Sequence, residues 1–598
     1  MTISDFINRA ARILFFTGKG GVGKTSLACA TGIALAAGGK KVLLVSTDPA
    51  SNLDEVLDTK LSGRPTPVPG AGGLFALNID PESAAAAYRE RVVGPYRGVL
   101  PDAAVASMEE QLSGACTVEI AAFDEFAKLL GDGHATAEFD HVLFDTAPTG
   151  HTIRLLSLPA AWTGFIATNT TGTSCLGPLA GLEAQKELYA ASLRSLSDEE
   201  TTTLVLVSRP ESSALAEAER TRNELAGIGM RRQVLVVNGF FTAHDNADSA
   251  AAALEARGQQ ALASMPAGLS ALPRVEVPLC AVPPMGVHGL GGLLSHEVVV
   301  TPAAFAAAPR EWPGLGDLIE DIAKQGPGVV MTMGKGGVGK TTIAAAIAVS
   351  LAERGRSVHL STTDPAAHVL KTVNGVIPGL RISRIDPKSE TAAYTAEVLH
   401  QTGSALDTQG MALLEEDLRS PCTEEIAVFR AFAEIVASRD SEFVVLDTAP
   451  TGHTLLLLDA AEAYHREVSR TNSDVPEAVK RLLPLLRDAA HTRILLVALP
   501  EATPVHEAAR LQTDLHRAGI NTYAWVINQS FSLSSHSDPL LVARGTQEEP
   551  FLMEVQTTLA ERVALVPWQP AAPVGREALL DLAGRAAKDP TLEEVASQ

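Results

Sequence analysis

Short, continuous apolar runs rich in β-branched residues recur along this chain and alternate with longer alanine-rich stretches. Runs of this kind are typical of strands buried on both faces, and their alternation with helices predicts mostly parallel sheets flanked by helices. We therefore expect an α/β fold. The first half predicts strands at residues 12–16, 41–46, 74–79, 141–145, 202–208, 233–237 and 274–279. The second half predicts them at 328–333, 357–362, 380–385, 443–447, 493–499, 523–528 and 562–568.

The two halves repeat each other in sequence as well as in pattern. Matching segments follow in the same order, with pairs at Lys24/Lys340, Asp48/Asp364, Asp80/Asp386, Cys116/Cys422, Asp145/Asp447 and Asn238/Asn528. The distance between partners only shrinks along the chain, so the second copy has shorter loops. A repeat of this length indicates a duplicated and fused domain. We expect a first domain at 1–300, a Pro- and Gly-punctuated linker at 301–325 and a second domain at 326–598.

Each half contains the pattern G-x-x-x-x-G-K-[ST] between a predicted strand and an alanine-rich helix, which predicts a phosphate-binding loop (P-loop). Its glycines let backbone N–H groups surround phosphates at a helix N-terminus. Lys24 and Lys340 are expected to reach the β- and γ-phosphates, and Thr25 and Thr341 to hold Mg²⁺. The predicted nucleotide contacts of the first loop are Gly18, Gly20, Gly21, Val22, Gly23, Lys24, Thr25 and Ser26. Those of the second are Gly334, Gly336, Gly337, Val338, Gly339, Lys340, Thr341 and Thr342.

Aspartates follow the predicted strands at the sheet edge where ligands bind in open α/β folds. Asp48 and Asp364 are candidates to orient the attacking water, and Asp145 and Asp447 to support Mg²⁺. A single aspartate at a strand end often only caps a turn. Recurrence of both aspartates in the two copies favours the catalytic interpretation, and the sequence TAPTGHT after Asp145 and Asp447 predicts a switch segment.

A second lysine lies directly after the first glycine of each loop, at Lys19 and Lys335. This feature resembles the deviant Walker A ATPases, in which that lysine reaches the nucleotide of the other subunit. The resemblance implies an internal pseudo-dimer, with Lys19 serving the second site and Lys335 the first. It also implies that Asn238 and Asn528 contact adenine, although a turn-capping role for them stays open.

The paired loops, the paired DTAPTGHT segments and the contexts SGACTVEIAAFDEF and TSCLGPLAGLE resemble the arsenical pump-driving ATPases (the ArsA type). The resemblance implies that Cys116, Cys175 and Cys422 bind arsenite or antimonite. Three thiolates are the ligands that such a soft centre prefers. Packing in a core is the expected role of Cys29 and Cys280. For His151 and His453, metalloid binding, interface packing and switch hydrogen bonding all stay open.

The net charge of −22 argues against nucleic acid or acidic lipid as the main partner. With no apparent signal peptide or membrane span, we expect a cytoplasmic protein recruited to the inner face of the membrane. The family resemblance implies a metalloid-stimulated ATPase that drives export through an integral-membrane efflux protein, with a small arsenic metallochaperone as a further partner. The alternative is a nucleotide-gated chaperone that delivers tail-anchored proteins to a membrane.

Overall fold

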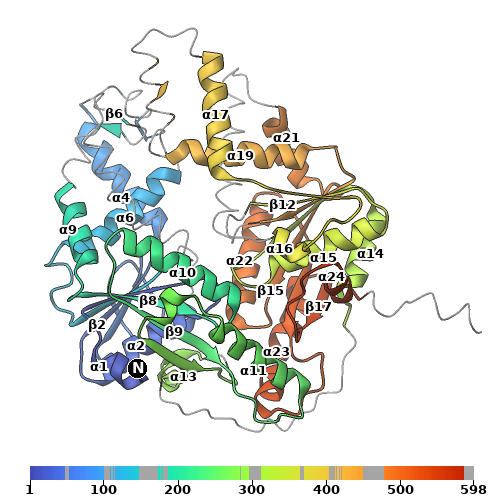
Figure 1. Cartoon of the computed structure of the whole chain (residues 1–598). Coiled ribbons are helices and arrows are strands. Elements are labelled where there is room, and N and C mark those ends of the chain that lie inside the picture. The colour runs from blue at the N-terminus through green and yellow to red at the C-terminus, as the bar shows by residue number, and fades with distance from the viewer. Residues whose placement is uncertain are drawn as a thin grey trace, which may run out of the picture. The chain divides into compact units, whose positions relative to one another are not determined.

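A computed structural model describes residues 1–47, 53–99, 101, 105, 108–109, 112, 115–146, 173–174, 177–178, 186–282, 284–294, 312–363, 369–402, 411, 414–415, 418, 421–448 and 477–584. The chain divides into two compact units, Met1–Val300 and Thr301–Gln598 (Figure 1). Each unit is a mostly parallel sheet flanked by helices, so the predicted fold class is confirmed.

The sheet of the first unit has the strand order β10-β9-β8-β1-β5-β2-β4-β3. All neighbours are parallel except β3 and β4, which pair antiparallel at one edge. The strands are β1 (Ile13–Thr17), β2 (Val42–Ser46), β3 (Thr66–Pro67), β4 (Leu74–Asn78), β5 (His141–Asp145), β8 (Thr202–Ser208), β9 (Gln233–Phe240) and β10 (Arg274–Pro278). A separate short hairpin joins β6 (Thr173–Ser174) and β7 (Gly177–Pro178).

Helices cover both faces of this sheet and enclose one hydrophobic core on each side. One face packs against α1 (Ile3–Asn8), α2 (Lys24–Ala37), α3 (Leu53–Leu57) and α13 (Gly286–Leu293). The other packs against α4 (Pro81–Val93), α6 (Ala115–Gly131), α9 (Lys186–Ser197) and α10 (Ser212–Gly227). Helices α11 (Ser249–Ala263) and α12 (Ala267–Ser270) add Ala261 and Leu269 to this second core, and the 3₁₀ turn η1 (Gly94–Tyr96) follows α4.

The second unit repeats this topology in the order β13-β12-β14-β11-β15-β16-β17, with every neighbouring pair parallel. Read from the other end, each strand occupies the place of its sequence partner in the first unit, as duplication predicts. The strands are β11 (Gly328–Met333), β12 (Val358–Thr362), β13 (Leu380–Arg384), β14 (Phe443–Asp447), β15 (Thr492–Ala498), β16 (Thr522–Ser530) and β17 (Val563–Pro567). All fourteen predicted strands are present.

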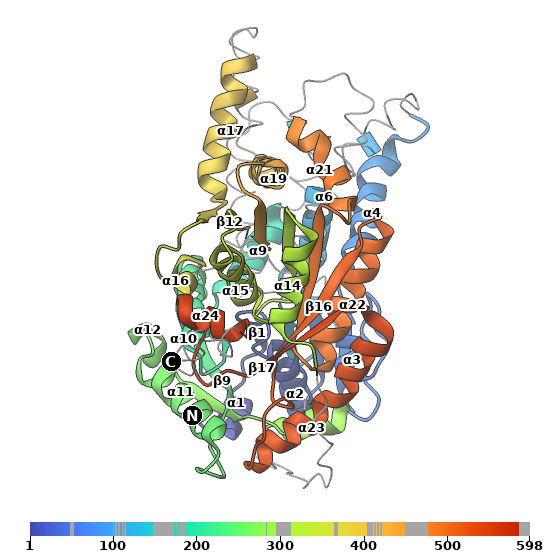
Figure 2. The same ribbon diagram turned by 90° about the vertical axis from the view of Figure 1, so that its right-hand side faces the viewer.

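The helices of the second unit again form two layers. Helices α14 (Leu315–Gln325), α15 (Lys340–Glu353), α16 (Val369–Val373) and α24 (Arg576–Leu582) share one core and lie together in Figures 1 and 2. The opposite core contains α19 (Pro421–Ala437), α21 (Glu477–Arg487), α22 (Ala502–Arg517) and α23 (Pro539–Glu554). The remaining elements are α17 (Pro387–Thr402) and the π-helical turn η3 (Val555–Leu559).

Helix α14 occupies residues 315–325 of the stretch that we expect to be a linker, 301–325. Leu315, Leu318, Ile319 and Ile322 of this helix are buried in the core of the second unit. The Pro and Gly residues of this stretch did not indicate this amphipathic helix, and the bounds of the linker stay a prediction. Residues 301–311 lie outside the described part of the chain.

Candidate nucleotide-binding sites

Both predicted phosphate loops connect a central strand to a long buried helix. Strand β1 leads through Gly18–Gly23 into α2, and β11 leads through Gly334–Gly339 into α15. A Cβ atom at Gly18 would lie 2.1 Å from the Val207 carbonyl oxygen, and one at Gly334 would lie 2.2 Å from that of Val497. Only glycine fits so close to the neighbouring strand, so each loop begins at a position that excludes any side chain.

The loop lysines are largely buried and turn back onto their own loops. The Lys24 ammonium donates to the carbonyl oxygen of Lys19 at 3.2 Å. That of Lys340 donates to the carbonyl oxygens of Gly334 at 2.9 Å and Lys335 at 3.0 Å. Each ammonium therefore lies inside the curve of the loop, where a phosphate bound by the loop amides would meet it.

Each unit places a threonine hydroxyl against a strand-end carboxylate at the start of the loop helix. Thr25 Oγ1 donates to Asp145 Oδ2 at 2.7 Å, and Thr341 Oγ1 donates to Asp447 Oδ2 at the same distance. In the second unit Thr362 also donates to Asp447 Oδ2, at 3.1 Å. Hydroxyl and carboxylate oxygens are the hard ligands that Mg²⁺ prefers, so these pairs fit the predicted metal role.

The two predicted adenine-contacting asparagines touch the loops. Asn238 Nδ2 donates to the Val22 carbonyl oxygen at 2.8 Å, and Asn528 Nδ2 donates to that of Val338 at 2.9 Å. A Cβ atom at Gly23 or Gly339 would lie 2.2 Å from the same amide nitrogen. Asn238 thus fixes the first loop to β9, and Asn528 fixes the second loop to β16. The sequence did not indicate this positioning role. Their contact with adenine stays a prediction.

We expect Asn238→Ala and Asn528→Ala to lower kcat/KM for ATP by about tenfold each at the affected site, because a loop released from its strand must be ordered again when phosphate binds. Steady-state ATPase assays measure this. Asn223→Ala, on the exposed side of α10, is the control and should leave kcat/KM unchanged. Normal kinetics in both loop variants would remove the positioning role.

Cys29 is confirmed as a core residue, since it is fully buried in the cluster around α2. Burial first, and the Asp145 carboxylate second, raise the pKa of its thiol well above the usual value. Cys280 is half-buried and packs against the same cluster. Cys116 and Cys422 are each the second residue of an equivalent helix, α6 and α19. The side chains of these two cysteines lie outside the described part of the structure, as do Asp48, Asp364, Cys175, His151 and His453.

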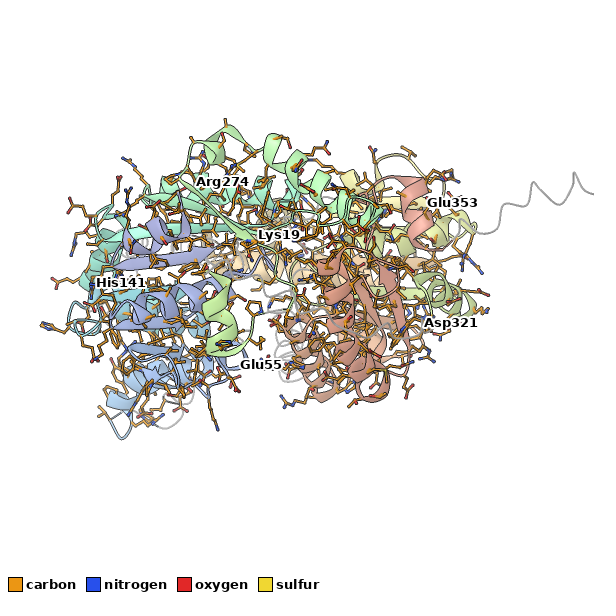
Figure 3. All side chains as sticks on the ribbon, turned by 90° about the horizontal axis from the view of Figure 1, so that it is seen from below. Lys19, Glu55, His141, Arg274, Asp321 and Glu353 are labelled. Carbon is orange, nitrogen blue, oxygen red and sulfur yellow. The ribbon has the colours of Figure 1, made fainter. Side chains whose placement is uncertain are left out.

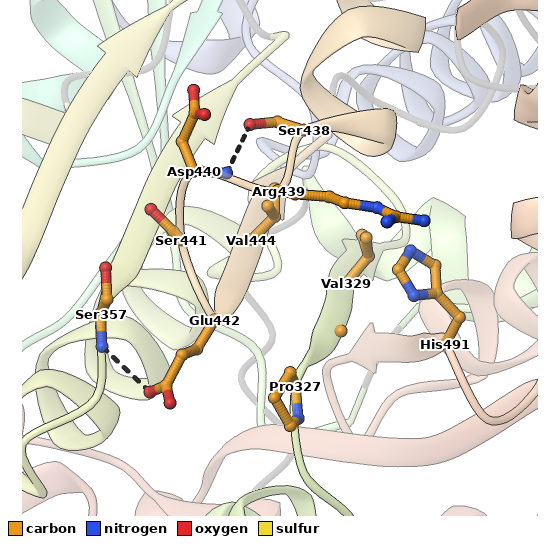
Figure 4. A pocket seen from close by; sticks show the side chains of 11 residues that line it. Pro327, Val329, Ser357, Ser438, Arg439, Asp440, Ser441, Glu442, Val444 and His491 are labelled. Atoms are coloured by element: carbon orange, nitrogen blue, oxygen red, sulfur yellow. Dashed lines mark hydrogen bonds between the residues drawn. The ribbon is translucent and has the colours of Figure 1, made fainter.

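A pocket of about 400 Å³ in the second unit lies away from the predicted chemistry (Figure 4). Its walls include Val329 and Val444, near the amino ends of β11 and β14, whereas Gly334 and Asp447 lie at the carboxyl ends of these strands. Asp440 N donates to Ser438 Oγ, and Ser357 N donates to a Glu442 carboxylate oxygen, both at 3.3 Å. This pocket therefore lies at the sheet edge opposite the phosphate loop.

Comparison with known proteins identifies the family to which the chain belongs. The family model of the anion-transporting ATPases matches residues 11–295, 328–474 and 461–588, and so covers both repeats. The chain belongs to the anion-transporting ATPase family. It is 53% identical over 581 residues to an arsenical pump-driving ATPase of Escherichia coli, covering 96% of this chain and 99% of that protein. It is also 53% identical to one of Acidiphilium multivorum, covering 95% and 98%.

Relatives of another name match more distantly. The ATPase GET3 of Mycosarcoma maydis is 33% identical over 246 residues, which cover 38% of this chain and 71% of that protein. Membership of the family makes the chain an ATP hydrolase, which agrees with the two loop–carboxylate sites. Among the residues that the structure describes, no helix combines the length and apolar character needed to cross a membrane.

Sequence reasoning missed the residues that bind the second lysine of each loop. Lys335 forms an ion pair with Glu507 of α22, and Lys19 donates to Ser213 Oγ of α10 at 3.3 Å. A signal was present, because glutamates occur at matching places of the repeat, Glu217 in ALAEAER and Glu507 in PVHEAAR. The significance of this match becomes clear only in the structure, where α10 and α22 place residues against the loop lysines.

Proposed function

We propose that this chain is an arsenite- and antimonite-stimulated ATPase that hydrolyses ATP at two sites between its halves and energises metalloid export through a membrane partner. The observation that carries the proposal is the doubled site. Two units of the same topology each bring a loop lysine and a Thr–Asp pair together at the start of the loop helix. The curated relatives that share about half of its residues over nearly the whole length are arsenical pump-driving ATPases.

In phosphoryl transfer, side chains contribute by positioning the reacting groups and by neutralising charge on the phosphate oxygens. Lys24 and Lys340 hold the β- and γ-phosphate oxygens, and Asp48 and Asp364 orient the attacking water. Lys19 and Lys335 act across the halves, each on the nucleotide of the other loop, as an internal pseudo-dimer. Bound Mg²⁺, held by Thr25 and Asp145 or by Thr341 and Asp447, would neutralise negative charge on the phosphate oxygens.

Metalloid binding is proposed for Cys116, Cys175 and Cys422. Two of these cysteines are the second residues of equivalent helices, α6 and α19, so a twofold arrangement of the units would present them at corresponding places. Three thiolates suit As(III) or Sb(III) as ligand. Thiolates drawn from both halves would bind the metalloid more tightly in the closed state, and that difference in affinity would favour hydrolysis.

The partner that the proposal requires is an integral-membrane arsenite efflux protein. The chain would act in the cytoplasm, at the inner face of the membrane, and a small arsenic metallochaperone would deliver the metalloid. The acidic net charge favours recruitment through this protein partner over direct binding to acidic lipid.

Serine at Cys116, Cys175 or Cys422 is expected to abolish stimulation by arsenite while basal hydrolysis continues, because a hydroxyl does not replace a thiolate for a soft centre. The ATPase rate of the pure protein, with and without arsenite, is the measurement. Cys280→Ser is the matched control and should keep full stimulation. Equal stimulation of all four variants would contradict the metalloid site.

The same assay separates the alternative function. A chaperone that delivers tail-anchored proteins would hydrolyse ATP at a rate insensitive to arsenite, and it would co-purify with tail-anchored proteins. An arsenite-dependent rate that is lost on thiol blocking supports the metalloid-driven pump.

A further inference from the structure

The second lysine of each loop is bound by a different partner in the two units. In the second unit the Lys335 ammonium forms an ion pair with the Glu507 carboxylate, and their side chains are 24% and 8% exposed. In the first unit the Lys19 ammonium donates to the neutral Ser213 hydroxyl at 3.3 Å; Lys19 is labelled in Figure 3. Each lysine is therefore docked on a helix of its own unit.

The two helices nevertheless offer the same pair of partners. Helix α10 carries Ser213 and, four residues later, Glu217, whereas α22 carries Thr503 and, four residues later, Glu507. Residues four apart lie on one face of a helix, one turn from each other. Each helix thus provides a hydroxyl and a carboxylate as possible partners for the lysine. The lysine binds the hydroxyl in the first unit and the carboxylate in the second.

Charge decides which of the two positions holds the lysine more strongly. A carboxylate adds the Coulomb attraction of an opposite charge, which a neutral hydroxyl cannot provide, and the low exposure of Glu507 limits its screening. In the first unit the Arg220 guanidinium lies 3.9 Å from the Glu217 carboxylate, within the same helix. The same guanidinium lies 3.9 Å from the Glu224 carboxylate as well, and the Lys19 ammonium is bound by Ser213.

We propose that Glu507 is a positioning residue that retains Lys335 on its own unit and so makes the two ATP sites unequal. Lys335 must give up an ion pair before it can serve the nucleotide at the first loop, whereas Lys19 gives up a single bond to a hydroxyl. This inference rests on the proposed function, in which these lysines act across the halves. It predicts that the first loop turns over ATP more slowly than the second in the absence of metalloid.

The test isolates the first loop by Lys340→Ala, which silences the second. In this background we expect Glu507→Gln to raise basal kcat by about five- to tenfold with little change in KM for ATP, because the amide keeps the shape of the side chain but not its charge. The arsenite-stimulated kcat should change less, so the stimulation ratio falls. Glu507→Asp, which keeps the charge on a shorter side chain, should give an intermediate rate.

The matched control is Glu217→Gln in a Lys24→Ala background, which isolates the second loop and should change basal kcat by less than about twofold. An unchanged or lower basal kcat in Glu507→Gln, with α22 still protected from hydrogen exchange, would overturn the role of Glu507. An equal rise in both glutamine variants would overturn it as well.

Lys335→Ala in the Lys340→Ala background tests the underlying function separately. Normal turnover there would refute action of Lys335 at the first loop, whatever Glu507 does.

Discussion

The double variant Lys24→Ala, Lys340→Ala is expected to lose ATP hydrolysis by at least about 10²–10³-fold. Both ammonium groups are nearly buried, at 7% and 6% exposed, and lie inside their loops against backbone carbonyl oxygens. A methyl group at either position can neither bind the phosphate oxygens nor neutralise charge as the terminal phosphate departs. Steady-state ATPase assays on the purified chain measure the loss.

The single variants locate the effect. Lys24→Ala should abolish turnover at the first loop and Lys340→Ala turnover at the second, so each should retain the activity of the other site. Lys40→Ala, an exposed lysine at the end of the turn after α2, is the control and should leave the rate unchanged. Full activity in both loop variants would refute the assignment of the phosphate-binding lysines.

Phe144→Ala is expected to destabilise the first unit by about 3–5 kcal/mol. Phe144 is fully buried, stacks on Phe15 at a ring-centroid distance of 4.6 Å and meets Phe126 edge-on at 5.2 Å. Alanine removes both contacts and leaves a cavity beneath the sheet, directly before Asp145. Amide hydrogen exchange of peptides from β1 and β5 reports the loss of protection in this unit.

Two comparisons make this result specific. Phe144→Leu should cost less than about 1.5 kcal/mol, because the second unit packs leucine at the matching place, Leu446, which is also fully buried. Peptides from β11 and β14 of the same variant protein should keep their protection, since they belong to the other unit. Unchanged exchange of β1 and β5 in Phe144→Ala would show that these rings do not support the core.

The strand pattern could be predicted from the sequence because parallel strands covered on both faces must be apolar throughout. All fourteen predicted strands are present, and the loop glycines and the threonine and aspartate of each site occur in the expected strand–loop–helix setting. Helix α14 was missed because Pro313, Gly314 and Gly316 are residues typical of turns and loops. Its four buried apolar residues define it only against the core that they contact.

Side-chain partners far apart in sequence were beyond prediction. The bonds from Asn238 to Val22 and from Lys335 to Glu507 join residues separated by most of a unit, and no local pattern specifies them. The role of a strand-end asparagine as a clamp on the loop appears only when its strand lies beside the loop.

The sequence by itself determined the duplication, the α/β class and the paired phosphate loops, because these depend on repetition, hydrophobic continuity and backbone chemistry that are local in the chain. Only the tertiary structure decided which groups hold the loops and their lysines, because parallel strands and their crossover helices bring together residues that the chain keeps apart. The two copies thus share a fold through their common pattern, and they differ at Lys19 and Lys335 through the charges that packing places around these two side chains.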